Sequence, residues 1–211
     1  MGVESSVQEA RQQFDVIGST TLGWHAMKTL AELEEFKNDD VVHRFLETWD
    51  IPMADAEELF EDMKKWMWLG AYAQEAIGDV FLGFGQSTKL IDEMWHTFIL
   101  FTNEYHEFCL RYFGRYIHHA PTPKRVYDET IARYERDPEK VMKENREAFT
   151  KQYELVYETL GEETLIKWYD TYHEKYTDEY MRSVWRWSFS PYDMRVGVAT
   201  AGMAVDDSGA D

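Results

Sequence analysis

Residues 89–121, KLIDEMWHTFILFTNEYHEFCLRYFGRYIHHAP, decide the fold of this chain. Their first part predicts one long helix from about Lys89 to Phe113, which Ser87 or Thr88 can cap. Its apolar residues cover most of the helix circumference: Leu90, Ile91, Met94, Trp95, Phe98, Ile99 and Phe101. A helix that is apolar on most sides is buried on most sides, so we expect it at the centre of the molecule.

Helical periodicity continues on both sides of this segment. Apolar residues recur at helical spacing in segments 42–49 and 59–67. An N-cap aspartate followed by proline at 137–138 begins a further helix, and Gly161 ends it. Another helix is expected over about 163–187. Because no segment alternates as strands do, the fold class is all-α, a single-domain bundle of about seven helices with a central buried helix.

The organisation along the chain is simple. Residues 1–22 are expected to be a weakly ordered N-terminal segment. Residues 23–193 form the helical domain. Residues 194–211 are expected to be a flexible acidic tail, because small and acidic residues without periodicity fill them.

The composition limits the class of protein. The chain has 211 residues, with 40 acidic and 22 basic side chains, a formal charge of −18 and an aromatic content of 16%. Disordered acidic chains lack aromatics, so we expect an ordered core beneath an acidic surface. That surface disfavours binding to nucleic acid and to anionic membranes, which both require a basic face. A small-molecule or peptide substrate remains compatible with it.

Cysteine content and hydropathy point to a compartment. The single cysteine, Cys109, excludes an intramolecular disulfide. The sequence contains neither a signal peptide nor an apolar run of transmembrane length. The cytoplasm is therefore the expected location.

Candidate metal ligands gather in one short segment. Asp92 and His96 are four residues apart and Glu93 and His96 are three apart, so each pair shares a helix face. His118 and His119 follow in the loop after the helix. The predicted metal ligands are Asp92, His96, His118 and His119, with Glu93, Cys109, Asp170 and His173 as further candidates.

Two other interpretations of this segment stay open. The same acids and histidines fit a satisfied polar network in the core, because buried polar groups need partners. They also fit an exposed helix face. Two adjacent histidines diverge, so one of His118 and His119 is expected to point inward, and Cys109 is by default a small buried apolar residue.

A second pattern concerns two helices. Glu93 and His96 fit the motif E-x-x-H, and Asp170 and His173 fit its variant D-x-x-H. Two such motifs are typical of di-iron carboxylate bundles, in which further helices each add a carboxylate. Only Asp62 lies near an apolar helix stripe, so the carboxylate count favours a smaller mononuclear site.

The segment from Ile91 to Pro121 resembles the core motif of the glycine-rich domain-containing protein-like family, approximately D-x-x-W-H…F-C-x-x-x-F-G-x-x-I-H-H-x-P. The matching positions are Asp92, Trp95, His96, Thr102, Tyr105, Phe108, Cys109, Phe113, Gly114, His118, His119 and Pro121. The resemblance implies a helical domain with a shared polar site, and it implies no particular reaction. His106 is not a motif position.

Two functions follow from these patterns. The first is a metal-dependent enzyme, a non-haem iron oxidoreductase with an aromatic-lined pocket around the ligands; zinc, copper and manganese are alternative metals. The second is a non-catalytic helical binding or scaffold module, whose motif residues form a structural polar network or a zinc site that uses Cys109. The enzyme requires a concave pocket that reaches His96, whereas the scaffold requires these side chains to be buried and mutually satisfied.

Overall fold

A computed structural model describes residues 27–78 and 82–186 of the chain. Helices are the only extended regular elements in these ranges, which confirms the all-α class. One isolated antiparallel bridge joins Trp49 to Trp185. The predicted N-terminal segment 1–22 and acidic tail 194–211 lie outside the described residues.

The described helices follow one another along the chain. Their bounds are α2 (Leu30–Glu34), α3 (Asp39–Thr48), α4 (Met53–Ala76), α5 (Lys89–Leu100), α6 (Thr102–Phe113), α7 (Lys124–Arg136), α8 (Pro138–Leu160), α9 (Glu162–Ile166), the π-helix η1 (Lys167–Thr171), α10 (Tyr172–Lys175) and α11 (Asp178–Val184). No helix among them is both long and apolar enough to cross a membrane.

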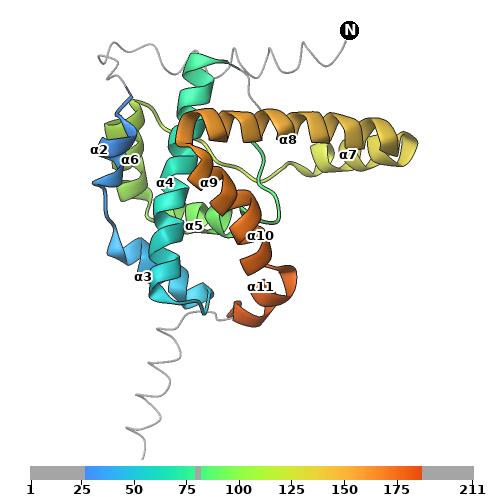
Figure 1. The fold of residues 1–211 in the computed structure, drawn as a ribbon. Coiled ribbons are helices and arrows are strands. Elements are labelled where there is room, and N and C mark those ends of the chain that lie inside the picture. Colours follow the sequence, from blue (N-terminus) through green and yellow to red (C-terminus); the bar gives the residue numbers. More distant parts are fainter. Residues whose placement is uncertain (1–26, 79–81, 187–211) are drawn as a thin grey trace, which may run out of the picture.

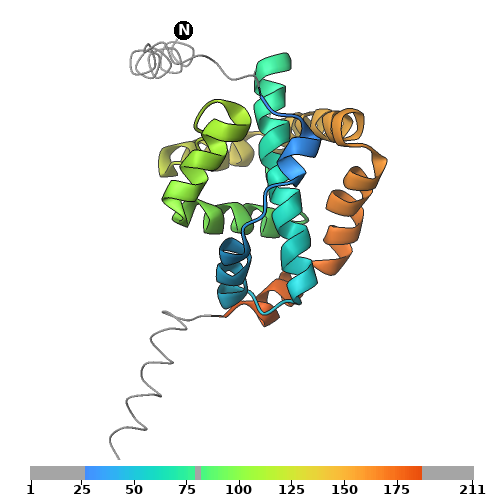
Figure 2. The same cartoon turned by 90° about the vertical axis from the view of Figure 1, so that its left-hand side faces the viewer.

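Helix α4 is the centre of the molecule. It packs against α2, α3, α5 and α8, and its buried residues extend from Ala56 to Ala73. Figures 1 and 2 show α6 on one side of α4 and the α9–α11 segment on the other. The prediction that segment 89–113 forms the central helix is therefore wrong, because α4 holds that place.

The predicted helix 89–113 is two helices. Phe101 has φ −85° and ψ 66°, which is not helical, and it ends α5 and begins α6. The turn brings Tyr105 and Phe108 of α6 back onto Phe98 of α5, with ring centroids 5.2 Å apart in both pairs. Burial of these aromatic rings offsets the helical hydrogen bonds lost at the turn.

The predicted helix 163–187 is also interrupted. Residues Lys167–Thr171 form a π-helix, and Tyr176 leaves the helical conformation before α11 begins. Both breaks raise the number of helical segments above the expected seven. By contrast, the predicted start of α8 at Asp137 and its end at Gly161 are confirmed: the Asp137 side chain accepts a hydrogen bond from the Lys140 N–H, and Gly161 has φ 87°.

Two charged side chains are buried in α4. Lys64, 1% exposed, donates to the Phe36 carbonyl at 2.7 Å and pairs with Glu61 at 2.9 Å. Asp62, 0% exposed, pairs with Lys167 at 2.7 Å and accepts a hydrogen bond from Tyr172 at 2.6 Å. Each charge has partners, as burial requires, and Asp62 ties α4 to the π-helix.

Candidate metal centre

Helix α5 supplies two of the three residues that form the centre. Asp92 and His96 lie one turn apart, so their side chains leave the same face of the helix. The exposed fractions of these side chains are 23% for Asp92 and 46% for His96. The opposite face of α5 carries Met94 and Phe98 into the core, which fixes the direction of the polar face.

His119 reaches the centre from the loop after α6. Gly114 ends that helix with φ 66°, a left-handed conformation that suits glycine and lets the chain reverse. The His119 ring then stacks on the indole of Trp95, with centroids 4.3 Å apart and planes 18° apart. This stack holds the imidazole beside α5.

A chain of two hydrogen bonds fixes the loop that carries His119. The Trp95 indole N–H donates to the Tyr105 hydroxyl at 3.0 Å, and that hydroxyl donates to the Ile117 carbonyl at 2.6 Å. Burial raises the pKa of Tyr105, so its hydroxyl stays protonated as a donor. Ile117 precedes His119 by two residues, and the chain of hydrogen bonds therefore anchors the segment that carries His119.

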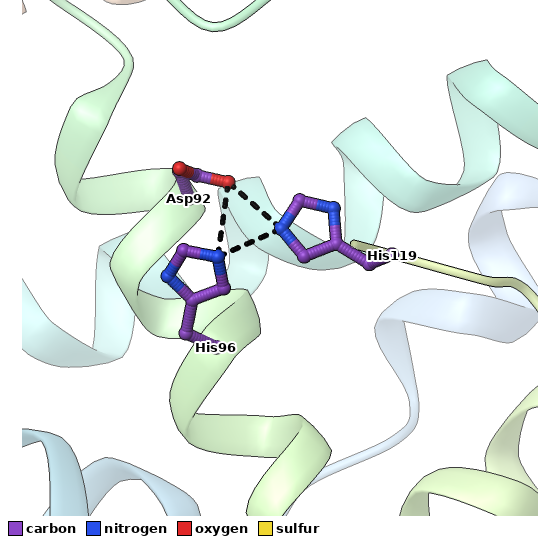
Figure 3. A group of neighbouring side chains, drawn as sticks. All are labelled: Asp92, His96 and His119. Atoms are coloured by element: carbon purple, nitrogen blue, oxygen red, sulfur yellow. Dashed lines mark hydrogen bonds and ion pairs between the residues drawn. The ribbon is translucent and has the colours of Figure 1, made fainter. Parts of the chain in front are cut away.

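Three potential ligand atoms converge at one point, as Figure 3 shows. The Nε2 atoms of His96 and His119 are 2.9 Å apart, and the Asp92 Oδ1 atom lies 3.1 Å from the His119 Nε2 and 3.8 Å from the His96 Nε2. The circle through these atoms has a radius of about 1.9 Å. A single ion can therefore bind all three at bond lengths of about 2.1 Å, the usual value for nitrogen and oxygen ligands.

The Asp92 Oδ1 atom is buried and is one corner of the triangle of ligand atoms. It has no hydrogen bond, and it makes ion-pair contacts of 3.1 and 3.8 Å with the Nε2 atoms of His119 and His96. An N–H of His119 or a cation in the triangle would satisfy this buried oxygen. The donor set thus fits a metal ion. Without an ion, the two imidazoles can share one hydrogen bond in which one ring donates.

Glu93 lies behind His96 rather than in the triangle. Its Oε2 atom is 3.7 Å from the His96 Nδ1, the ring nitrogen that faces away from Asp92. This contact is too long for a hydrogen bond, so Glu93 is a charged neighbour of His96 and not a member of the triangle.

The other predicted ligands lie away from the triangle. His118 is exposed, and its ring packs against Tyr116 with centroids 4.9 Å apart. Cys109 is fully buried beside Tyr105, and burial raises the pKa of its thiol. Asp170 and His173 are exposed on the π-helix and α10. In the described part of the chain, the ligand cluster thus consists of Asp92, His96 and His119 alone.

A cleft of about 700 Å³ opens beside the three ligands. Asp92, His96 and His119 are among the residues that line it. Aromatic and apolar residues from α4, α5 and the two loops also line it, including Trp66, Met67, Phe84, Trp95, Ile117 and Pro121, together with His118 and Thr122. Its volume is in the range of small-molecule sites, so the ligands face a space that can hold a substrate.

Sequence reasoning did not assign the supporting roles of Trp95 and Tyr105. Both are aromatic residues of the 89–121 segment, but two residues that are ten apart in one continuous helix do not contact each other. Only the turn at Phe101 brings the Trp95 indole N–H to the Tyr105 hydroxyl. The presence of a polar atom on each ring was the one available signal, because buried indole and phenol groups need partners.

Comparison with known proteins gives one similarity. The sequence model of a family described as UCP032817-like matches residues 50–130, a range that contains α4, α5, α6 and the loop with His119. No curated protein and no solved structure matches the chain. The expected resemblance to the glycine-rich domain-containing protein-like family is therefore wrong, since the family match is to a different family. The short motif of aromatic, histidine and cysteine positions did not distinguish between families.

Proposed function

We propose that the protein is a metal-dependent enzyme, a mononuclear non-haem iron oxidoreductase whose ligands are Asp92, His96 and His119. The observation that carries this proposal is the convergence of one carboxylate oxygen and two imidazole nitrogens in the lining of a cleft that also contains Trp66, Phe84 and Trp95. Two histidines and one carboxylate that leave coordination positions open are typical of non-haem Fe(II) oxygenases.

The donor set favours iron. Two imidazoles and one carboxylate that leave coordination positions open suit Fe(II); manganese, zinc and copper are alternatives. The distances between the ligand atoms, 2.9, 3.1 and 3.8 Å, fall on both sides of the values for ligands at right angles and for tetrahedral ligands, so the choice of iron rests on the donor chemistry.

The surroundings of the three ligands affect both solvent access to them and the orientation of the histidine rings. The His96 side chain is 46% exposed, so water and small molecules reach the centre. Trp95 holds the His119 ring by stacking. When bound, Fe(II) would supply O₂ binding and electron transfer, and the residues of the cleft would hold the organic substrate beside it.

Anaerobic titration of the metal-free protein, purified without a histidine tag, tests this proposal. We expect one Fe(II) per chain for the natural protein and almost none for His96→Ala. His106→Ala is the matched control, because His106 lies on α6 beside Tyr116 and outside the ligand cluster. Less than about 0.2 equivalents of Fe(II), Mn(II) or Zn(II) bound to the natural protein would refute a metal centre.

A non-catalytic scaffold module is the second candidate, and one contact favours it. The 2.9 Å approach of the two Nε2 atoms is a good hydrogen-bond distance, so His96 and His119 can lock α5 to the loop without a metal. This function predicts no metal uptake and a loss of stability in His96→Ala. A zinc site that uses Cys109 receives no support, since that thiol is buried outside the ligand cluster.

The proposed compartment is the cytoplasm. It rests on the cysteine count, because a chain with one cysteine gains no disulfide from an oxidising environment.

A further inference from the structure

Helices α7 and α8 form a hairpin, residues 124–160, whose outer part projects from the other described helices (Figure 1). This hairpin is called the arm below. Helix α7 has its main packing contacts with α8, and none of its residues is buried by the described part of the chain. A helix that packs mainly against a single neighbour leaves most of its circumference open to another molecule.

The apolar side chains of α7 gather along one open face. Tyr127, Ile131 and Tyr134 follow one another at intervals of four and three residues, so they form a stripe along the helix, here called the α7 stripe. Their exposed fractions are 59%, 40% and 47%. An amphipathic surface helix normally turns such a stripe toward a partner, so α7 presents half of an apolar contact.

The rest of the arm adds to this apolar surface. Val126, Met142, Tyr153 and Tyr157 are 36–53% exposed, so the arm holds seven of the fourteen large apolar side chains that are exposed in the described residues. At about 100 Å² for each half-exposed tyrosine and somewhat less for the others, these seven present roughly 600 Å². A stable interface covers about 800 Å² on each partner, a little over half of it apolar, so the arm has enough apolar surface for one.

The charge of the arm favours a second copy of this chain as the partner. Residues 124–160 contain eight basic and nine acidic side chains, a net charge of −1, whereas the whole chain carries −18. Two chains of this charge repel each other, and the repulsion is smallest where their nearly neutral parts meet. Charges of the arm also pair within it, as Lys124 does with Asp128 and Arg133 with Glu144. A strongly charged partner would therefore gain little from this surface.

From these observations we propose that the protein is a homodimer in which two arms pack side by side through their α7 stripes. A twofold axis near Ile131 makes the two α7 helices antiparallel. It brings Tyr127 of one copy near Tyr134 of the other, because these residues lie four and three positions from Ile131. None of the described residues that line the cleft belongs to the arm, so the dimer is independent of the proposed metal centre.

Sedimentation velocity of the full chain, from micromolar to hundreds of micromolar concentration, tests the proposal. We expect the mass to rise to twice 25.1 kDa, the mass of one chain. Added salt should tighten the dimer, because it screens the repulsion between two acidic chains and leaves the apolar contact in place. A chain that stays monomeric at the highest concentration, or a dimer that salt weakens, would overturn the proposal.

A substitution in the α7 stripe locates the contact. Ile131→Glu places a charge at its centre, and Ile166→Glu on α9 is the matched control, since Ile166 is 48% exposed and lies outside the arm. We expect Ile131→Glu to weaken the dimer about tenfold or more and Ile166→Glu to leave its dissociation constant unchanged, with folding checked by circular dichroism. Equal dimerisation by the two variants would show that another surface forms the dimer and would contradict the proposal. The mass and the salt dependence of the natural protein need no variant.

Discussion

The hydroxyl of Tyr105 holds together the two parts of the proposed metal centre. It accepts from the Trp95 indole N–H at 3.0 Å and donates to the Ile117 carbonyl at 2.6 Å, in a side chain that is 0% exposed. Tyr105→Phe removes this one oxygen atom and keeps the ring. The substitution leaves a buried N–H and a carbonyl without their partner.

The expected loss of unfolding free energy follows from these two contacts. A buried polar group that loses its partner costs about 1–3 kcal/mol, and the two groups together should cost about 3 kcal/mol of unfolding free energy. For a protein of this size, that corresponds to a fall of about 6–12 °C in the melting temperature. Because the Ile117 segment carries His119, we also expect Fe(II) affinity to fall about tenfold or more, as for other outer-shell partners of metal ligands.

Thermal unfolding followed by far-UV circular dichroism, together with Fe(II) titration, measures both effects. Tyr116→Phe is the matched control, since Tyr116 is 38% exposed and packs its ring edge-on against Tyr105 at 5.3 Å. It should change the melting temperature by less than about 2 °C. A Tyr105→Phe protein as stable as the Tyr116→Phe protein would refute the anchoring role of the hydroxyl.

Three further predictions concern buried groups outside the centre. Lys64→Met should cost about 3 kcal/mol in urea unfolding, because it removes the donor to the Phe36 carbonyl and the ion-pair partner of Glu61, whereas Lys65→Met at the half-buried neighbour should cost under about 1 kcal/mol; equal costs would contradict the role of Lys64. The buried Cys109 thiol, whose pKa is raised by burial, should react with a thiol reagent at least a hundredfold more slowly in native than in urea-unfolded protein, and rapid native labelling would argue against its burial. Burial also raises the pKa of Asp62 despite its contact with Lys167, so the folded state disfavours the charged carboxylate. The contribution of Asp62 to the unfolding free energy therefore falls as the pH rises above about 4. Asp62→Asn lacks this titration, and its unfolding free energy relative to the natural protein should therefore increase from pH 4 to pH 7; a decrease would contradict the raised pKa.

Much of the helical framework could be predicted from the sequence because local signals mark it. The aspartate and proline at 137–138 and the glycine at 161 bound α8 where the cap residues place them. The turn at Phe101 could not be predicted, since the apolar periodicity of segment 89–113 continues through it. That turn is stabilised by contacts of Phe98 with Tyr105 and Phe108, which are tertiary and leave no local pattern.

The candidate site was predictable in part for the same reason. Asp92 and His96 are one helical turn apart, so their proximity is a local property of α5. The choice between His118 and His119 depends on the path of a loop, and it is His119 that stacks on Trp95 and lies beside Asp92 and His96. The D-x-x-H pair at 170–173 matched a motif by spacing alone, and its two residues are exposed and belong to no ligand cluster within the described ranges 27–78 and 82–186.

The most direct test of the account compares two adjacent histidines. Only His119 contributes a ligand atom to the triangle, although the two residues share chain position, chemistry and loop. Anaerobic Fe(II) titration of His118→Ala and His119→Ala proteins, with folding checked by circular dichroism, should give one equivalent bound for His118→Ala and at least a tenfold loss of affinity for His119→Ala. Equal metal binding by the two variants would contradict a centre built from Asp92, His96 and His119.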